Sequence, residues 1–569
     1  WAYLVIIAAL VGLAIAFWPW VEAFVRAWIQ PVRYNLRWYL PIAGIVFALA
    51  LVLVWRPKLA FLRGLIILPL CFVAIVSAWH YGGFCPVISS YYFDDYEFYH
   101  YYIGAKYAPE AGYTEMYNAS IVADAELGGL DYDKRQIRNL SFDMQDQARS
   151  AERIAEEGRP VRPYRDVKEV LEPEEKARIK GLFSEERWEE FVKDIKFFKG
   201  HLRSSWHGIL RDKGYNATPV WSTTGGLLSN AVSTDSKAGM QLLALLDPIL
   251  LVIAFILLLW AYGPATALLC ALFFGANFLM MQSPTMKHAF LRMDWIALTL
   301  MSTALVRKRW YVPAGVLMAY AFLTRMFPIV FVFGLGARGL YVLLRTRRLP
   351  RRYWVFGFSF AAACAVFILG SIIYAGGLWQ WRGFFDKIGY HNADISTWRI
   401  GFKFLFMQTY DLVPPGTSWW EYKINLQQYM RDYAAVWWGI QGAVLFLSFF
   451  LLRRLRDDEA LPYSFVPVFF LVAPTHYYYA MLVIPFLFFA IRPGQPLRTV
   501  GMVLLFAICL VGWNYHGMGW KFPLSFDMSA MLFVFVLYMM FTSWIEGRLV
   551  GIARRHGEEE PPDYAPDPA

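Results

Sequence analysis

Apolar runs about 20 residues long recur along most of the chain, and short polar stretches separate them. A helix of about 20 residues crosses the hydrocarbon core of a bilayer, since each residue adds about 1.5 Å of length. The pattern therefore predicts an all-α polytopic membrane protein with about 14 spans. The expected spans cover residues 3–20, 39–55, 61–79, 240–262, 264–282, 289–306, 311–326, 327–344, 353–376, 435–452, 461–475, 477–491, 499–516 and 527–546.

Composition and charge support a membrane protein and argue against a soluble or a nucleic-acid-binding one. Hydrophobic residues make up 58% of the 569 residues and charged residues 17%, against about a quarter charged in soluble proteins. The net charge of +10 comes from clusters of Arg and Lys between the spans. This is the positive-inside pattern of cytoplasmic loops rather than a nucleic-acid surface. The five cysteines are scattered, without metal-ligand spacing or a disulfide pattern.

Two polar segments, 80–239 and 377–434, are too long to be simple connections. With the basic clusters inside, both segments lie on the external side. Residues 148–200 place apolar residues at helical spacing, which predicts amphipathic helices. The expected organisation is peripheral N-terminal spans (1–60), a first core span with an acidic, aromatic loop (61–124), an external helical insertion (125–239), a transmembrane core (240–376), an external loop (377–434), C-terminal spans (435–546) and a cytoplasmic disordered tail (547–569).

The densest acidic cluster directly follows an apolar run, in the stretch YYFDDYEFYHYYIGAKY at 91–107. Asp94, Asp95 and Glu97 have three possible roles: a general base for an acceptor hydroxyl, ligands for a divalent metal, or solvated loop residues. Aromatic rings such as Tyr101 and Tyr102 are common at membrane interfaces and also line ligand pockets, where they stack on sugars. Carboxylates together with rings are what a sugar site requires.

Further polar residues stand at the external ends of other spans. Arg325 lies in LTRMFP, before Pro328, which is expected to break the helix; an arginine at that depth requires a partner or an anion such as a lipid phosphate. His391 and Asn392 lie in YHNADISTWRIG, and His476 lies in APTHYYYAMLVIP. Together these clusters predict a cavity that opens outward near the lipid headgroups. The sequence contains no phosphate loop, zinc signature or nucleophile elbow.

These stretches resemble the GT-C superfamily of membrane glycosyltransferases, which use polyprenyl-phosphate sugars, and most of all the α-mannosyltransferases of glycosyltransferase family 87. EFYHYYIGAKYAPEAGYTEMY at 97–117 is similar to the family's first external loop, with Glu97 in place of an aspartate. Residues 294–348 are similar to its span, basic turn and second span, with Arg325 where lysine is usual. His391 and APTHYYYAMLVIP also match family positions, so the resemblance covers about half of the chain and leaves out residues 125–235.

The resemblance implies a GT-C-type helical core and sugar transfer, with mannose as the expected sugar, from a polyprenyl-phosphate donor to a lipid or glycan acceptor. The reaction would take place at the outer face of a plasma or bacterial inner membrane. The base would be Asp94, Asp95 or Glu97, and Arg325 would contact the donor phosphate. His391 and His476 would position donor or acceptor, with Asn392, Tyr101 and Tyr102 beside them. No cofactor is expected, although a divalent metal at the acidic cluster stays open, and the insertion at 125–239 could bind a protein partner.

Two rival functions remain open at this point. A lipid or glycan transporter would be expected to show duplicated halves or ionisable residues in mid-span, and the sequence shows no convincing internal duplication. A non-catalytic scaffold subunit of a membrane complex would account equally well for Glu97 in place of the family aspartate.

Overall fold

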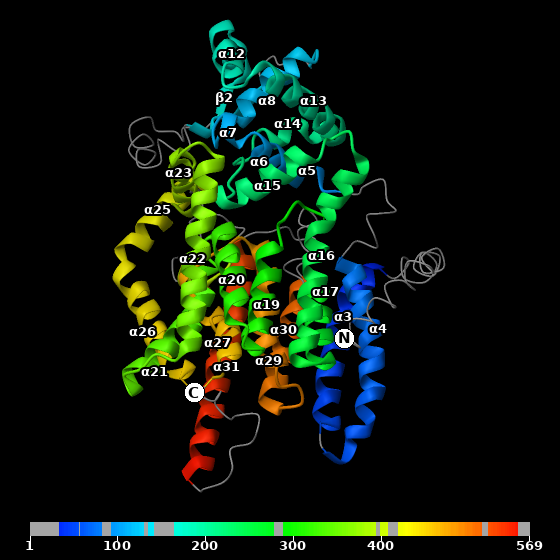
Figure 1. The fold of residues 1–569 in the computed structure, drawn as a ribbon, viewed down its shortest axis with the longest axis vertical. Coiled ribbons are helices and arrows are strands. Elements are labelled where there is room, and N and C mark those ends of the chain that lie inside the picture. The colour runs from blue at the N-terminus through cyan, green and yellow to red at the C-terminus, as the bar shows by residue number, and fades with distance from the viewer. Residues whose placement is uncertain are drawn as a thin grey trace.

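The computed structural model describes residues 33–55, 57–81, 93–129, 135–141, 164–277, 288–393, 399–407, 419–453, 455–514 and 522–555. In these ranges the chain forms a layer of long helices with a mostly helical domain at one end (Figure 1). Eight helical segments are long and apolar enough to cross a membrane: Asn35–Val54 in α3 (Arg33–Val54), α4 (Arg63–Tyr81), α16 (Lys237–Tyr262), α21 (Ile329–Thr346), α22 (Arg351–Tyr374), α26 (Ala434–Leu452), Pro496–Trp513 in α30 (Pro496–Asn514) and Ser525–Arg548 in α31 (Phe522–Arg555).

Several expected spans form shorter helices between the long ones. Three have 13 to 15 residues: α17 (Pro264–Ala276), α19 (Asp294–Arg307) and α20 (Tyr311–Arg325). Such helices are only about 20–22 Å long, against a hydrocarbon core of about 30 Å. The segment expected at 461–475 is divided between α27 (Asp457–Tyr463) and α28 (Phe465–Leu471), and that at 477–491 between η7 (His476–Leu482) and α29 (Val483–Ala490). The span expected at 3–20 lies outside the described residues.

The short helices are the most buried part of the helical layer. In α19 every residue from Asp294 to Val306 is buried, as is every residue of α29. Close backbone approach makes this packing possible: a Cβ on Gly275 of α17 would come within 2.1 Å of the Ser77 carbonyl oxygen in α4. Any larger residue at Gly275 would force these two helices apart.

The domain at the end of the layer is built from residues 93–129, 135–141 and 164–236 (Figure 1). Aromatic rings dominate its core, with Trp206 packed on Tyr99 and Phe191 on Tyr107. Its elements are α5 (Asp95–Phe98), η4 (Tyr99–Ile103), α6 (Gly104–Lys106), α7 (Ala108–Ala111), α8 (Met116–Glu126), an antiparallel pair β1 (Gln136–Arg138) and β2 (Tyr164–Asp166), α11 (Val167–Leu171), α12 (Pro173–Lys180), α13 (Glu185–Leu202), η5 (Arg203–Ser205), α14 (Trp206–Ile209) and α15 (Pro219–Ala231).

The amphipathic helices expected in the charged stretch are confirmed as α11, α12 and α13. Their buried residues are apolar with a single exception, Asp194; the others include Val167, Ile179, Phe191 and Ile195. Ser184 starts α13, because its side chain accepts a hydrogen bond from the Arg187 backbone N–H.

The second long polar segment lies at the same end of the molecule. It contains α23 (Trp379–Ala393), α24 (Phe402–Met407) and α25 (Trp419–Asp432). Phe384 of α23 belongs to the domain core and packs on the ring of Tyr113. The side of a membrane that this end faces stays a prediction.

The domain is fixed directly on the helix ends beneath it. Trp221 of α15 donates its indole N–H to the Leu291 carbonyl oxygen over 3.0 Å, and the Thr218 hydroxyl donates to the Leu323 carbonyl oxygen over 2.5 Å. These bonds hold the start of α15 on the segment before α19 and on the end of α20.

Candidate functional site

The three acids of the 94–97 cluster have different surroundings. Asp94 is the N-cap of α5, and its carboxylate accepts the Glu97 backbone N–H over 2.9 Å. Asp95 is half-buried and interacts electrostatically with His201 of α13. Glu97 alone is buried against the helical layer, with its Oε2 atom 3.0 Å from the Nε atom of Arg292. Of the three acids, only Glu97 forms an ion pair with a buried arginine.

Arg292 occupies the segment just before α19, where Asp247 fixes its backbone. The Asp247 carboxylate accepts the backbone N–H groups of Arg292 and Met293 over 2.6 and 2.9 Å. The Arg292 guanidinium lies over the Tyr101 ring at 4.0 Å and near that of Tyr477 at 5.8 Å. A buried guanidinium is costly to desolvate, and the ion pair together with the ring faces offsets that cost.

Arg325 is the second arginine of the site and the last residue of α20. The helix ends there because Met326 takes a left-handed conformation with φ of 62°, and Pro328 then starts α21. The expected turn before Pro328 is therefore confirmed. The Arg325 guanidinium donates to the Leu291 and Thr324 carbonyl oxygens over 2.9 and 3.0 Å. Its Cζ atom lies 5.8 Å from the Tyr101 ring centre, so both arginines share one ring.

Burial changes the proton affinity of the acids. It raises the pKa of Glu97, and the Arg292 charge opposes this change. It also raises the pKa of Asp94 well above its ordinary value, and the nearby Glu97 charge acts in the same direction. A carboxyl group whose pKa is raised toward neutrality is better suited to accept a proton than one of ordinary pKa.

The remaining predicted site residues differ in position. Tyr101 belongs to the site, whereas Tyr102 does not, because its hydroxyl donates to the Val232 carbonyl oxygen over 2.6 Å within the domain. His476 is buried at the start of η7, and its ring contacts Tyr477, which in turn faces Arg292. The side chains of His391 and Asn392 lie outside the described residues.

Arg292 and Asp247 are functional candidates that the sequence reasoning did not select. The available signal was an ionisable residue within or beside an apolar run, which in membrane proteins indicates a functional position. A third such residue, Asp294, is buried at the first position of α19 and interacts electrostatically with both arginines. The site therefore joins Glu97 with acids and arginines of the helical layer.

The described part of the chain contains no group of three or more His, Cys, Asp or Glu side chains arranged to hold a metal ion. A closed crevice without free space for a water molecule lies beside the arginines; it is lined by Arg292, Met293, Trp295, Ile296, Tyr477 and Tyr478. A sugar would enter only if these side chains moved apart, since sites for small molecules usually have at least about 300 Å³.

Comparisons with protein-family models, with curated proteins and with solved structures found no match to this chain.

Proposed function

We propose that this chain is an integral-membrane glycosyltransferase that moves a sugar from a polyprenyl-phosphate donor to a lipid or glycan acceptor. The observation that carries the proposal is a buried carboxylate, Glu97, beside two arginines that share the Tyr101 ring. This set combines a proton acceptor, cations for a phosphate and an aromatic face for a sugar. It lies at the ends of apolar helices, where a lipid-linked substrate would present its headgroup.

In the proposed reaction the acceptor hydroxyl attacks the anomeric carbon of the donor sugar. The new bond forms between that oxygen and the carbon, while the bond from the carbon to the phosphate oxygen breaks. Glu97 takes the hydroxyl proton, and Arg292 and Arg325 stabilise the negative charge on the departing phosphate. Because the phosphate is already an activated leaving group, no nucleotide site is required.

The ion pair between Glu97 and Arg292 fits this scheme as a resting state. A donor phosphate is a strong partner for a guanidinium and would compete with Glu97 for Arg292. Once Arg292 contacts the phosphate, the Glu97 carboxylate becomes available to the acceptor. Donor binding would in this way prepare the base for the second substrate.

The finer parts of the proposal come from the sequence pattern and from the resemblance. The pattern of apolar runs suggests about 14 spans. The resemblance suggests a GT-C-type core, mannose as the sugar, an outer-face site in a plasma or bacterial inner membrane, and positioning roles for His391, Asn392 and His476. The insertion at 125–239 is proposed to bind a protein partner.

Substitution of Glu97 by Gln tests the proposal most directly. The variant Glu97→Gln keeps the side-chain shape but removes the proton acceptor, so transfer from a polyprenyl-phosphate sugar should fall by about 10² to 10⁴-fold. Radiolabelled sugar transfer by the purified protein, with mannose, glucose and arabinose donors tested in parallel, measures the change. Glu186→Gln makes the same substitution on the exposed face of α13 and should retain wild-type transfer.

Two further variants separate chemistry from folding. Arg325→Gln should raise KM for the donor, because this arginine binds the donor phosphate, and should also lower kcat, because it stabilises the charge on the departing phosphate. Glu97→Asp keeps the partner charge of Arg292, so it should fold like the wild type even if Glu97→Gln does not. Full transfer by Glu97→Gln would exclude this carboxylate as the base. Absence of transfer by the wild type with every donor would instead favour a scaffold, for which the Glu97–Arg292 ion pair is purely structural.

A further inference from the structure

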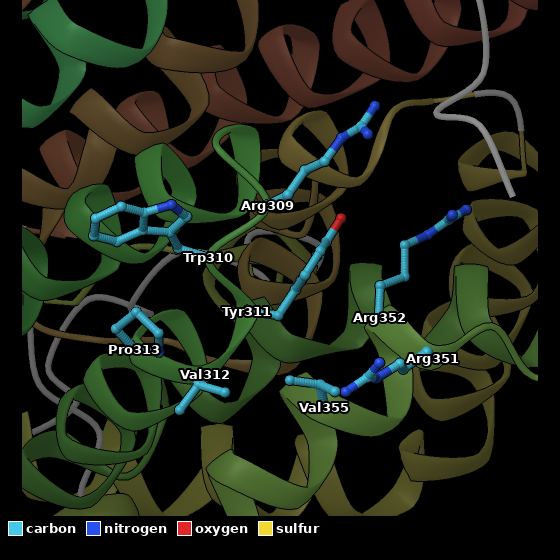
Figure 2. A pocket seen from close by; sticks show the side chains of 8 residues that line it. All are labelled: Arg309, Trp310, Tyr311, Val312, Pro313, Arg351, Arg352 and Val355. Carbon is cyan, nitrogen blue, oxygen red and sulfur yellow. The ribbon is translucent and has the colours of Figure 1, made fainter.

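A second and larger pocket lies at the opposite end of the helical layer from Glu97. It has a volume of about 390 Å³ and lies between the start of α20 and the start of α22 (Figure 2). The two arginines of the Glu97 site stand at the other ends, before α19 and at the end of α20, so a full helix length separates the two places. The residues that line the pocket are Arg309, Trp310, Tyr311, Val312, Pro313, Arg351, Arg352 and Val355.

The lining of this pocket is basic. It contains three arginines and no acidic residue, and the Tyr311 ring lies between the side chains of Arg309 and Arg352 in Figure 2. Arg352 forms an ion pair with Asp457 over 2.9 Å, but that carboxylate also binds Arg338 over 2.7 Å. A single acid outside the lining is thus shared between two arginines, and the lining itself contributes only positive charges. Such a site favours an anion with several oxygen acceptors.

The surroundings of the pocket place it at the level of membrane headgroups. Trp310 is 57% exposed, and Trp354, one turn into α22, is 63% exposed. Trp310 packs edge-on against Trp260 at the end of α16, and the Lys308 ammonium lies 4.9 Å from the Trp260 ring centre. Exposed tryptophans beside cationic residues are typical of the interface between hydrocarbon and water. The apolar Val312, 54% exposed, continues along α20 toward the bilayer interior.

We propose that this pocket, hereafter the arginine pocket, binds the phosphate of an anionic lipid headgroup. The phosphate oxygens would accept hydrogen bonds from Arg309 and Arg351, while the acyl chains would lie against Trp310 and Val312. The arrangement favours a lipid over a free anion, because the exposed apolar side chains Trp310 and Val312 lie next to the arginines. This proposal does not depend on the chemistry assigned to Glu97.

The full-length purified protein is the material for the test, and native mass spectrometry with added lipid is the measurement. The wild type should bind phosphatidylglycerol at least tenfold more tightly than phosphatidylcholine. The double variant Arg309→Gln/Arg351→Gln should lose about 30-fold in affinity for phosphatidylglycerol, on the scale of two surface cations near an anionic lipid. Its affinity for phosphatidylcholine should fall by less, because the choline ammonium of that lipid already offsets the phosphate charge.

The matched control is Arg345→Gln/Arg348→Gln. It removes two exposed arginines at the same end of the layer that do not line the pocket. It should change phosphatidylglycerol binding by less than about threefold. Equal losses in the two double variants would show general charge attraction and overturn the proposal. Complete displacement of phosphatidylglycerol by about 10 mM inorganic phosphate, a concentration that fills a site of millimolar affinity for the free anion, would also overturn it in favour of a free anion. If the double variant does not fold, Arg309→Gln and Arg351→Gln are tested singly, with a loss of about fivefold expected for each.

Discussion

At the scale of single residues, Asp94 caps α5 with a hydrogen bond but carries a negative charge that its buried position disfavours. Its carboxylate caps α5 through the Glu97 backbone N–H, yet burial and the Glu97 charge raise its pKa. A carboxyl group with a raised pKa binds its proton more readily in the folded state than in the unfolded state. Its contribution to stability is therefore greatest below the unfolded pKa of about 4 and is lost as pH rises through the folded value.

Asp94→Asn should accordingly make the folded protein more stable than the wild type at pH 8. Asparagine retains the cap and carries no charge, so the difference should disappear as the pH falls toward 4. Asp94→Ala loses the cap as well and should be less stable than Asp94→Asn by about 0.5–2 kcal/mol at every pH. Thermal unfolding of the purified protein between pH 4 and 8 measures both effects. A wild-type advantage over Asp94→Asn at pH 8 would contradict the assigned pKa direction.

The sequence allowed part of the site to be predicted at this scale. Glu97, Tyr101 and Arg325 were selected because acids, rings and a Pro-terminated helix end are visible along the chain. Arg292 was not selected, since its role depends on Glu97, which is 195 positions away (292 − 97) and reaches it only through the fold. Tyr102 was selected only because it follows Tyr101 in the sequence. One position along the helical turn, its side chain points into the domain core and not toward the arginines.

At the scale of elements, one buried acid connects α13 to two other parts of the domain. Asp194 accepts hydrogen bonds from the Lys106 ammonium, the Tyr107 hydroxyl and the Thr234 hydroxyl, over 2.7, 2.8 and 2.7 Å. Lys106 and Asp194 are each only 2% exposed. Removing one partner leaves a buried charge without its main counter-ion, which typically costs about 3–5 kcal/mol.

Asp194→Ala should therefore destabilise the end domain by about 3 kcal/mol. The loss lies at the lower end of the range because Glu190 still contacts Lys106. Protease resistance of residues 93–236 in the full-length protein, measured against urea concentration, follows the loss. Lys193→Ala breaks an exposed ion pair at the neighbouring position and should have little effect. Equal sensitivity of the two variants would show that the buried ion pair is not what holds α13 in place.

Helical periodicity was sufficient to predict α11 to α13. Hydropathy alone, however, predicted one span at 461–475, where the structure has two short helices, α27 and α28. Asp457, Asp458 and Glu459 follow a basic stretch in the sequence and look like part of a solvated loop. In the structure all three are buried, because arginines from α21, α22 and α30 surround them. A hydropathy window cannot register such compensation, since most of the compensating charges, among them Arg492, are more than 30 positions away.

At the scale of the whole molecule, the arrangement predicts which surfaces share one side of a membrane. Exposed residues Glu174 of α12 and Asp386 of α23 lie at the domain end, whereas exposed Arg348 follows α21 at the other end (Figure 1). In a variant without the native cysteines, Glu174→Cys and Asp386→Cys should react with a membrane-impermeant thiol reagent from the same side of sealed vesicles. Arg348→Cys should react only from the opposite side. Labelling of all three from one side would exclude a transmembrane orientation of the helical layer.

The buried charges of α27 also constrain the order in which the protein can be completed during synthesis. Glu459 binds Arg492 and Arg498 over 2.7 and 3.1 Å, and Arg498 binds Glu546 of α31 over 2.5 Å. Arg498 leaves the ribosome 48 residues before Glu546, so for that interval its second counter-ion does not yet exist. An uncompensated arginine is expensive in hydrocarbon. Synthesis of α31 thus allows the preceding helices to reach their final packing, and a nascent chain released before α31 would expose an unmatched charge to the cell's quality-control proteases.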